Sequence, residues 1–222
     1  MLKRYIGDRA FYRHVLAVAI PIIIQNTITN FVALLDNVMV GQVGTMQMSG
    51  VSIANQLIFV FNVCVLGGIS GAGIFSAQFY GDENHVGIRQ TFRFKFLLGL
   101  LLAVGGIAIF WFAGTPLISL FLQGGGEPHE IQATLQYGRE YLDIMLCGLV
   151  PFAVATVYSG TLRETGQTFV PMIAGVVAVF VNLLLNYVLI FGHLGAPAMG
   201  IKGAAIATVI SLANTLCHTA RI

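Results

Sequence analysis

Residues 20–41 have the sequence IPIIIQNTITNFVALLDNVMVG, and this stretch decides the class of the protein. Asp36 is its only charged residue. A run of about 20 mostly apolar residues is long enough to cross the hydrocarbon core of a bilayer as one helix. The composition of the whole chain decides whether this helix spans a membrane or is buried in the core of a soluble domain.

The chain has too few charged residues to cover the surface of a soluble domain. Of its 222 residues, 57% are hydrophobic and 9% are charged, and the mean hydropathy is +0.85. Ordinary soluble domains contain about 25% charged residues. Lipid as the surrounding solvent removes the need for a polar surface. The small formal net charge of +2 suggests neither nucleic acid nor an acidic partner.

The hydrophobic pattern predicts an all-α integral membrane protein with six transmembrane helices. Short breaks rich in Gly, Pro and other turn residues separate them. The helices are expected at residues 15–40, 47–79, 91–122, 134–160, 168–192 and 201–220. Gly67 with Gly71, and Gly203 with Ala207, have the spacing of small residues that lets membrane helices approach closely.

The basic residues predict the orientation in the membrane, because Lys and Arg are enriched in cytoplasmic loops. Arg139 and Lys202 fall on one side of the six predicted helices. The other nine of the eleven basic residues fall on the opposite side: Lys3, Arg4, Arg9, Arg13, Arg89, Arg93, Lys95, Arg163 and Arg221. The N-terminus is therefore expected in the cytoplasm, and an even number of helices returns the C-terminus there.

Polar residues within the predicted helices are candidates for function, since ionisable groups are costly at membrane depth. Asp36 lies one to two turns from the outer end of the first helix, and Asn182 and Asn186 share one face of the fifth. The other polar side chains expected in this outer layer are Asn55, Gln56 and Thr208. Such oxygen ligands suit a proton or Na⁺ better than a transition metal. Alternatively, Asn and Thr only form hydrogen bonds between helices.

No pattern of catalytic residues is evident, and the protein is not expected to be an enzyme. The three cysteines are far apart and form neither a disulfide framework nor a zinc pattern, and the five histidines have no paired spacing. Arg139 and Asp143, four residues apart, are expected to form an ion pair.

Four motifs in order resemble the multidrug and toxic compound extrusion (MATE) family. The opening span 20–44 has a proline near its inner end, an acidic residue at Asp36 and a closing VGQVG. The other three are LRETGQTFVPM (162–172), VNLLLNYVLIFG (181–192) and MGIKGAAIATVIS (199–211). Glu164 departs from the family, which usually has glycine there. Asn186 stands where part of the family has aspartate and NorM-like members often have asparagine.

The resemblance implies a transporter of twelve helices in two six-helix lobes, of which residues 1–222 would be the N-terminal lobe. It implies export of drugs, expected to be cationic and amphipathic, across the bacterial cytoplasmic membrane, driven by Na⁺ or H⁺ antiport. A second lobe, in the same full-length chain or another chain, is the expected partner. The coupling residues would be Asp36, Asn182, Asn186 and Thr208, and further cavity-lining residues Gln25, Asn55, Gln56 and Tyr141.

Three other functions stay open at this point. A lipid-linked-saccharide flippase of the same superfamily would have more cationic residues in its cavity, and no Lys or Arg is expected at mid-membrane depth. A non-transporting membrane subunit would explain a chain with one lobe. A membrane enzyme would need clustered catalytic groups, which the sequence does not show.

Overall fold

The computed structural model describes residues 8–122 and 127–220. Its helices are α1 (Arg9–Gly41), α2 (Thr45–Gly81), α3 (His85–Phe121), α4 (Pro128–Glu164), α5 (Phe169–Phe191) and α6 (Ile201–Ala220), with a short 3₁₀ turn, η2 (His193–Gly195), before α6. All six α-helices are long and apolar enough to cross a membrane. The all-α class and the six spans predicted from the sequence are confirmed.

Four helices are longer than the hydrophobic pattern indicated, and α1, with 33 residues, is the shortest of them. α2, α3 and α4 have 37 residues each, which is about 55 Å of helix against about 30 Å of hydrocarbon. α3 begins at His85, six residues before the predicted start, and Asn84 caps it by accepting from the Gly87 amide at 2.9 Å. α4 continues to Glu164 instead of ending near residue 160. Hydropathy marks where a helix is apolar, and these helices continue through polar residues.

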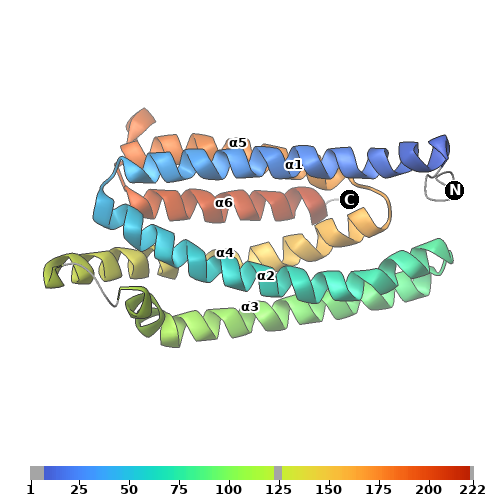
Figure 1. Cartoon of the computed structure of the whole chain (residues 1–222), viewed down its shortest axis with the longest axis horizontal. Coiled ribbons are helices and arrows are strands. Elements are labelled where there is room, and N and C mark those ends of the chain that lie inside the picture. Colours follow the sequence, from blue (N-terminus) through green and yellow to red (C-terminus); the bar gives the residue numbers. More distant parts are fainter. Residues whose placement is uncertain (1–7, 123–126, 221–222) are drawn as a thin grey trace, which may run out of the picture.

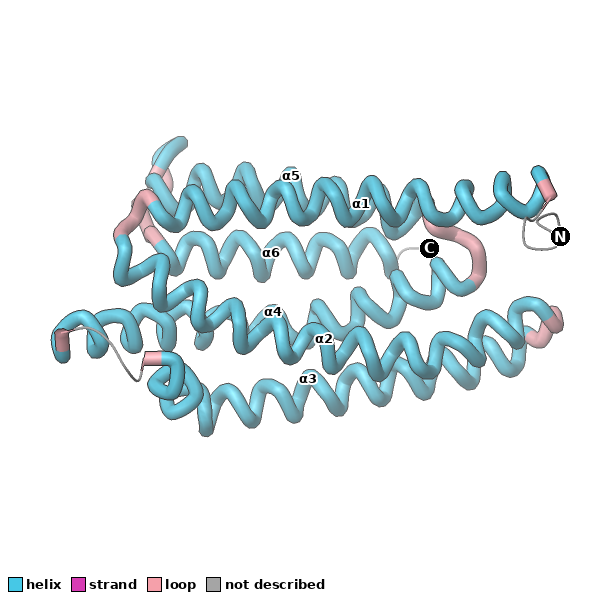
Figure 2. The backbone as a smooth tube through the Cα atoms, in the orientation of Figure 1, coloured by secondary structure: helices cyan, strands magenta, loops and turns pink. Residues whose placement is uncertain are grey.

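The helices form two groups, with α1, α5 and α6 together and α2, α3 and α4 together (Figure 1). The groups meet mainly where α4 packs along α6, and α1 packs chiefly on α5. Figure 2 shows that the α2–α3 turn and the α4–α5 connection lie at one end of the bundle. The α1–α2 and α5–α6 connections, the end of α3 and the start of α4 lie at the opposite end.

The basic residues divide between these two ends. We call the end with the α2–α3 turn the basic end, because six basic residues lie within about three helix turns of it: Arg9, Arg13, Arg89, Arg93, Lys95 and Arg163. Lys202 is the second residue of α6, and Arg139 lies about three turns into α4, so both are nearer the opposite end. Lys3, Arg4 and Arg221 lie outside the described residues. The cytoplasmic location of the basic end stays a prediction.

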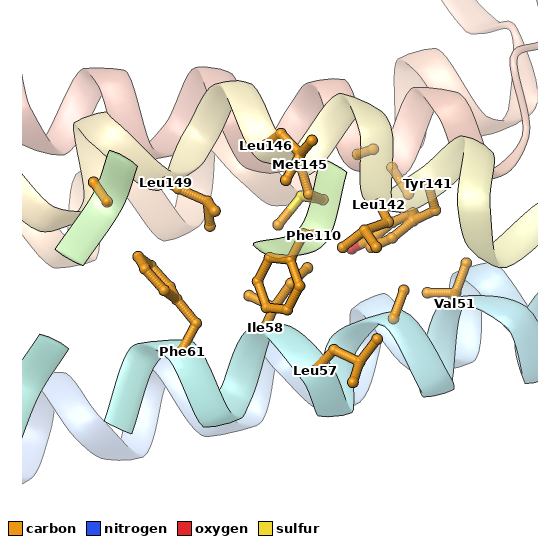
Figure 3. Close-up of a cluster of buried hydrophobic side chains, with 14 of the residues drawn as sticks. Val51, Leu57, Ile58, Phe61, Phe110, Tyr141, Leu142, Met145, Leu146 and Leu149 are labelled. Atoms are coloured by element: carbon orange, nitrogen blue, oxygen red, sulfur yellow. The ribbon is translucent and has the colours of Figure 1, made fainter. Parts of the chain in front are cut away.

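The apolar core lies between α2 and α4, with side chains from α3 completing it (Figure 3). Phe61 of α2 and Phe110 of α3 meet edge to face, with ring centroids 6.4 Å apart. In lipid, bringing apolar helices together gains little from the hydrophobic effect, so helix contact depends on close packing. α2 and α4 touch backbone to backbone, since a methyl group at Gly50 would lie 2.7 Å from the Gly138 nitrogen.

One of the two predicted close approaches is found and the other is wrong. A methyl group at Gly203 would lie 2.6 Å from the Leu189 carbonyl oxygen, so α6 packs tightly on α5 there. Gly67 and Gly71 face open space on the exposed side of α2, with no atom within 4 Å of an added methyl group. Spacing alone does not show which face of a helix meets a neighbour.

Candidate ion and substrate site

A cavity of about 510 Å³ lies between the two groups of helices. Its walls come from α1, α2, α4, α5 and α6. A volume of this size suits a drug-sized molecule. Apolar side chains form much of the wall, and polar groups are added near both ends; among these are Asp36 of α1 and Arg163 of α4.

Asp36 is the centre of a polar cluster between α1 and α5. The Asn186 amide donates to an Asp36 carboxylate oxygen at 2.7 Å and to the Asn182 side-chain oxygen at 3.2 Å. Asn186 is 1% exposed and Asn182 is 6% exposed. The two asparagines lie four residues apart, so one face of α5 presents both to α1. Turned over, the Asn182 amide would instead place its nitrogen 3.0 and 3.3 Å from the two Asp36 oxygens.

The cluster extends to α6 and α4. The Asn182 amide donates to the Thr208 hydroxyl at 3.4 Å, and that hydroxyl donates to the Ala204 carbonyl of its own helix. The Tyr141 hydroxyl of α4 faces Thr208 and Asn55, close enough to Asp36 to be affected by its charge. Four helices, α1, α4, α5 and α6, therefore contribute side chains to the cluster around one half-buried carboxyl group, and Asn55 of α2 faces Tyr141.

No cation neutralises Asp36 in the part of the chain that the structure describes. The ion pairs found there are Lys95–Glu164, Arg139–Asp143 and Lys202–Glu140. A half-buried carboxylate with an amide donor but no counter-ion is costly in a membrane, and binding a proton or a metal cation removes that cost. The chemistry of the cluster therefore fits a small hard cation or a proton.

The remaining predicted cavity residues do not gather around Asp36 as one set. Gln25 lines the same cavity, but it lies near the basic end, where its side-chain oxygen accepts from Arg163 at 2.7 Å. Asn55 and Tyr141 lie behind the cavity wall, not on it. The expectation that Gln56 lines the cavity is wrong for this structure, because its side chain is exposed. Successive side chains of a helix point about 100° apart around its axis, so Gln56 faces a different direction from Asn55.

A charged cluster at the basic end of the cavity is not predicted by the sequence pattern. The predicted fourth helix ends at residue 160, which would leave Arg163 in a connecting loop, and the charge count places Lys95 in the cytoplasm. Because α4 continues to Glu164, Arg163 instead lines the cavity. Lys95 is fully buried and donates to Glu164 at 2.5 Å and to the Thr161 hydroxyl at 2.7 Å. The only signal in the sequence was the glutamate at a position where the resembling family usually has glycine.

The ion pair expected at the opposite end is present. Arg139 and Asp143 are 2.9 Å apart, and Arg139 also donates to the Phe110 and Trp111 carbonyls of α3. These bonds attach the first half of α4 to α3 outside the cavity, so the pair is structural.

Comparisons with known proteins agree with this architecture. The chain is 30% identical to "Probable multidrug resistance protein NorM" of Thermotoga maritima, covering 90% of this chain and 41% of that protein. It is 33% identical to "Probable multidrug resistance protein YoeA" of Bacillus subtilis, covering 88% of this chain and 41% of that protein. The chain thus spans less than half the length of these relatives.

Solved structures share the fold. An outward-facing multidrug resistance MATE family transporter of the MOP superfamily superposes with a TM-score of 0.79 at 23% identity, covering 93% of this chain and 44% of that one. A MATE structure in complex with MaL6 gives the same TM-score at 22% identity. Since the MatE family model matches residues 21–188, more than half of the chain, the protein belongs to the MATE family of membrane transporters and resembles its NorM members.

Proposed function

We propose that this chain forms one six-helix lobe of a cation-coupled multidrug antiporter in a bacterial cytoplasmic membrane. The family consists of transporters, not enzymes, and the relatives named above are probable multidrug resistance proteins. Their greater length supports a second lobe as the partner. The observation that carries the proposal is the environment of Asp36: the carboxyl group lies at the wall of a drug-sized cavity, accepts from the Asn186 amide and has no counter-ion among the described residues.

Coupling follows from the chemistry of one carboxylate with alternative cationic partners. A proton, Na⁺ or the cationic group of a drug would each neutralise Asp36, and one excludes the others. An ion entering from outside would therefore release a bound drug, and a drug entering from the cytoplasm would release the ion. Side-chain oxygens of Asn182 and Thr208 would complete a Na⁺ site, since hard cations prefer oxygen ligands.

The cavity supports an amphipathic substrate. Between Asp36 and Arg163 the wall is mixed: Val32, Ile69, Phe152 and Val179 are apolar, and Thr29 and Thr156 add hydroxyl groups. An aromatic or aliphatic body would lie against the apolar side chains, with its cationic group toward Asp36. The lining supports drug export over a saccharide flippase: among the described residues that line it, Arg163 is the one Lys or Arg, and Glu164 and Asp36 are acidic.

The test is cation binding by the purified chain in detergent. For the wild type, either Na⁺ at constant ionic strength or a lowered pH should raise the melting temperature. Ligand at a hundred times its dissociation constant stabilises a protein by about 2.7 kcal/mol. Asp36→Asn should keep the fold and remove this response, because an amide cannot exchange a proton or balance a cation. Asp82→Asn, an exposed carboxylate at the α2–α3 turn, is the matched control. A full response in Asp36→Asn, or none in the wild type, would contradict the proposal.

A further inference from the structure

Arg163 is a cation at the basic end of the cavity with unused hydrogen-bonding capacity. One guanidinium nitrogen donates to Gln25 at 2.7 Å, which fixes the group between α4 and α1. The Nε nitrogen is buried and has no hydrogen-bond partner within the described chain. Burying an unpaired donor on a charged group is costly. Because Nε itself has almost no accessible surface, a ligand would meet the accessible part of the half-buried guanidinium, which lines the cavity wall.

The neighbouring carboxylate does not neutralise Arg163, because another cation holds it. Glu164 pairs with Lys95 at 2.5 Å, and Lys95 also donates to Thr161 at 2.7 Å. The Lys95 side chain is 0% exposed and that of Glu164 is 16% exposed. Gly73 of α2 leaves the space that the Glu164 carboxylate occupies, since a side chain at position 73 would collide with it. The buried pair therefore leaves the charge of Arg163 available to the cavity.

The cavity thus has an anionic group near one end and a cationic group near the other. Gln25, which binds Arg163, and Asp36 lie eleven residues apart on α1, which is about 16 Å along the helix. Apolar side chains such as Val32 and Phe152 line the wall between them. A ligand complementary to this wall is elongated, with a cationic group at one end and an anionic oxygen group at the other.

We propose that Arg163 is a specificity-determining residue that binds an anionic oxygen group, such as a carboxylate, of the transported molecule. The Lys95–Glu164 pair acts as its positioning element, since it keeps Glu164 from occupying the guanidinium. The inference rests on the proposed transport function and adds a substrate class to it. It makes zwitterionic amphipaths the preferred ligands over the simple cations that Asp36 alone would select.

The test uses two probes that differ only at the anionic group: a xanthene dye with a free carboxylate and the methyl ester of the same dye. Binding of each to the purified chain in neutral detergent is measured by fluorescence polarisation. Arg163→Gln should weaken binding of the acid about tenfold, which corresponds to about 1.4 kcal/mol, and leave binding of the ester nearly unchanged. Arg93→Gln, which removes an exposed charge near the same end of α3, should change neither.

A second pair of variants separates this role from a structural one. Lys95→Met frees Glu164 to pair with Arg163, so binding of the acid should fall while binding of the ester is kept. Lys95→Met combined with Glu164→Gln removes both buried charges and should restore binding of the acid. A merely structural effect of Lys95 would weaken both dyes equally and would not be restored selectively.

Several outcomes would overturn the inference. If the acid and the ester respond equally to Arg163→Gln, Arg163 does not select an anionic group, although the proposed function stands. If neither dye binds the wild type, the cavity does not bind such amphipaths, and this assignment fails before any variant is compared; cation binding at Asp36 remains a separate measurement. If anionic phospholipid displaces the acid and an excess of soluble carboxylate does not, the anion is a lipid headgroup and the assignment to a transported molecule is wrong.

Discussion

At the scale of single residues, the two asparagines beside Asp36 have different contacts. Asn186 is almost fully buried and donates directly to the carboxylate at 2.7 Å. Asn182 lies one helical turn away, lines the cavity and bonds to Thr208. A hydrogen bond to a charged group contributes about 1.5–3 kcal/mol, more than one between neutral groups. Asn186 therefore stabilises the charged form of Asp36 directly, and Asn182 is better placed to act as an ion ligand.

We expect Asn186→Ala to strengthen the apparent affinity for the coupling cation by about tenfold, because losing a charge-assisted bond destabilises the empty, charged form of Asp36. Asn182→Ala removes one neutral ligand and should have a smaller effect. Neither should abolish cation binding, as Asp36→Asn does. The measurement is the cation dependence of the melting temperature, with Asn37→Ala, an exposed neighbour of Asp36, as the control. An Asn186→Ala variant with wild-type cation affinity would show that this bond does not matter for ion binding.

The sequence indicated part of this site. The helical period predicts that Asn182 and Asn186 share one face of the fifth helix. Asp36 is recognisable as a candidate because it is the only charged residue of its apolar stretch. The contact of Asn186 with Asp36 joins residues 150 positions apart, and no local pattern predicts which helix faces which. For the same reason the sequence does not predict the buried partner of Lys95, since Glu164 lies 69 positions away.

At the scale of helices, the contact between α2 and α4 depends on two facing glycines. Gly50 and Gly138 let the backbones touch, and an added methyl group at Gly50 would lie 2.7 Å from backbone atoms that cannot rotate away. Gly67 on the same helix faces open space. The sequence predicted the existence of these helices well, because long apolar runs are distinctive. It predicted their contacting faces poorly, because glycines on both faces of α2 look alike.

We expect Gly50→Ala to lower the free energy of unfolding by about 1–3 kcal/mol, as other overpacked sites do. Gly67→Ala should not destabilise the protein, because the new methyl group meets no neighbour and alanine favours a helix by about 1 kcal/mol over glycine. Unfolding of both variants in mixed micelles, followed by circular dichroism, compares the two values. Equal stabilities would mean that the backbone contact between α2 and α4 is not as close as described.

At the scale of the whole molecule, the concentration of Lys and Arg at the basic end predicts that the α2–α3 turn lies in the cytoplasm. We therefore expect a membrane-impermeant thiol reagent added to intact cells to label His129→Cys, in the first turn of α4, and not Asp82→Cys. Both positions are exposed. Cys64, Cys147 and Cys217 must first be replaced, since all three are exposed as well. Labelling of position 82 alone would reverse the predicted orientation.

The helices of this chain form one wall of the cavity, and much of the surface of α1 is exposed. Asp36 lies on this helix, whose exposed large apolar residues include Ile23, Phe31, Leu34 and Val38. Alternating access in such transporters moves one repeat against another around a shared site. A single lobe offers only one side of that movement. We therefore expect the chain to transport only when its cavity faces a second six-helix lobe, supplied by a longer chain, another chain or a second copy.

The most direct test of the central claim is dye efflux from proteoliposomes, with the mass of the purified protein in detergent measured alongside. Reconstituted species that contain two six-helix lobes should export the dye when a Na⁺ or H⁺ gradient is imposed. Export of the dye should stop when an ionophore removes the gradient or when Asp36→Asn is introduced. A monodisperse monomer of this chain that drives efflux would contradict the need for a second lobe. Gradient-driven efflux that persists in Asp36→Asn would contradict the claim that this carboxyl group couples the ion to the drug.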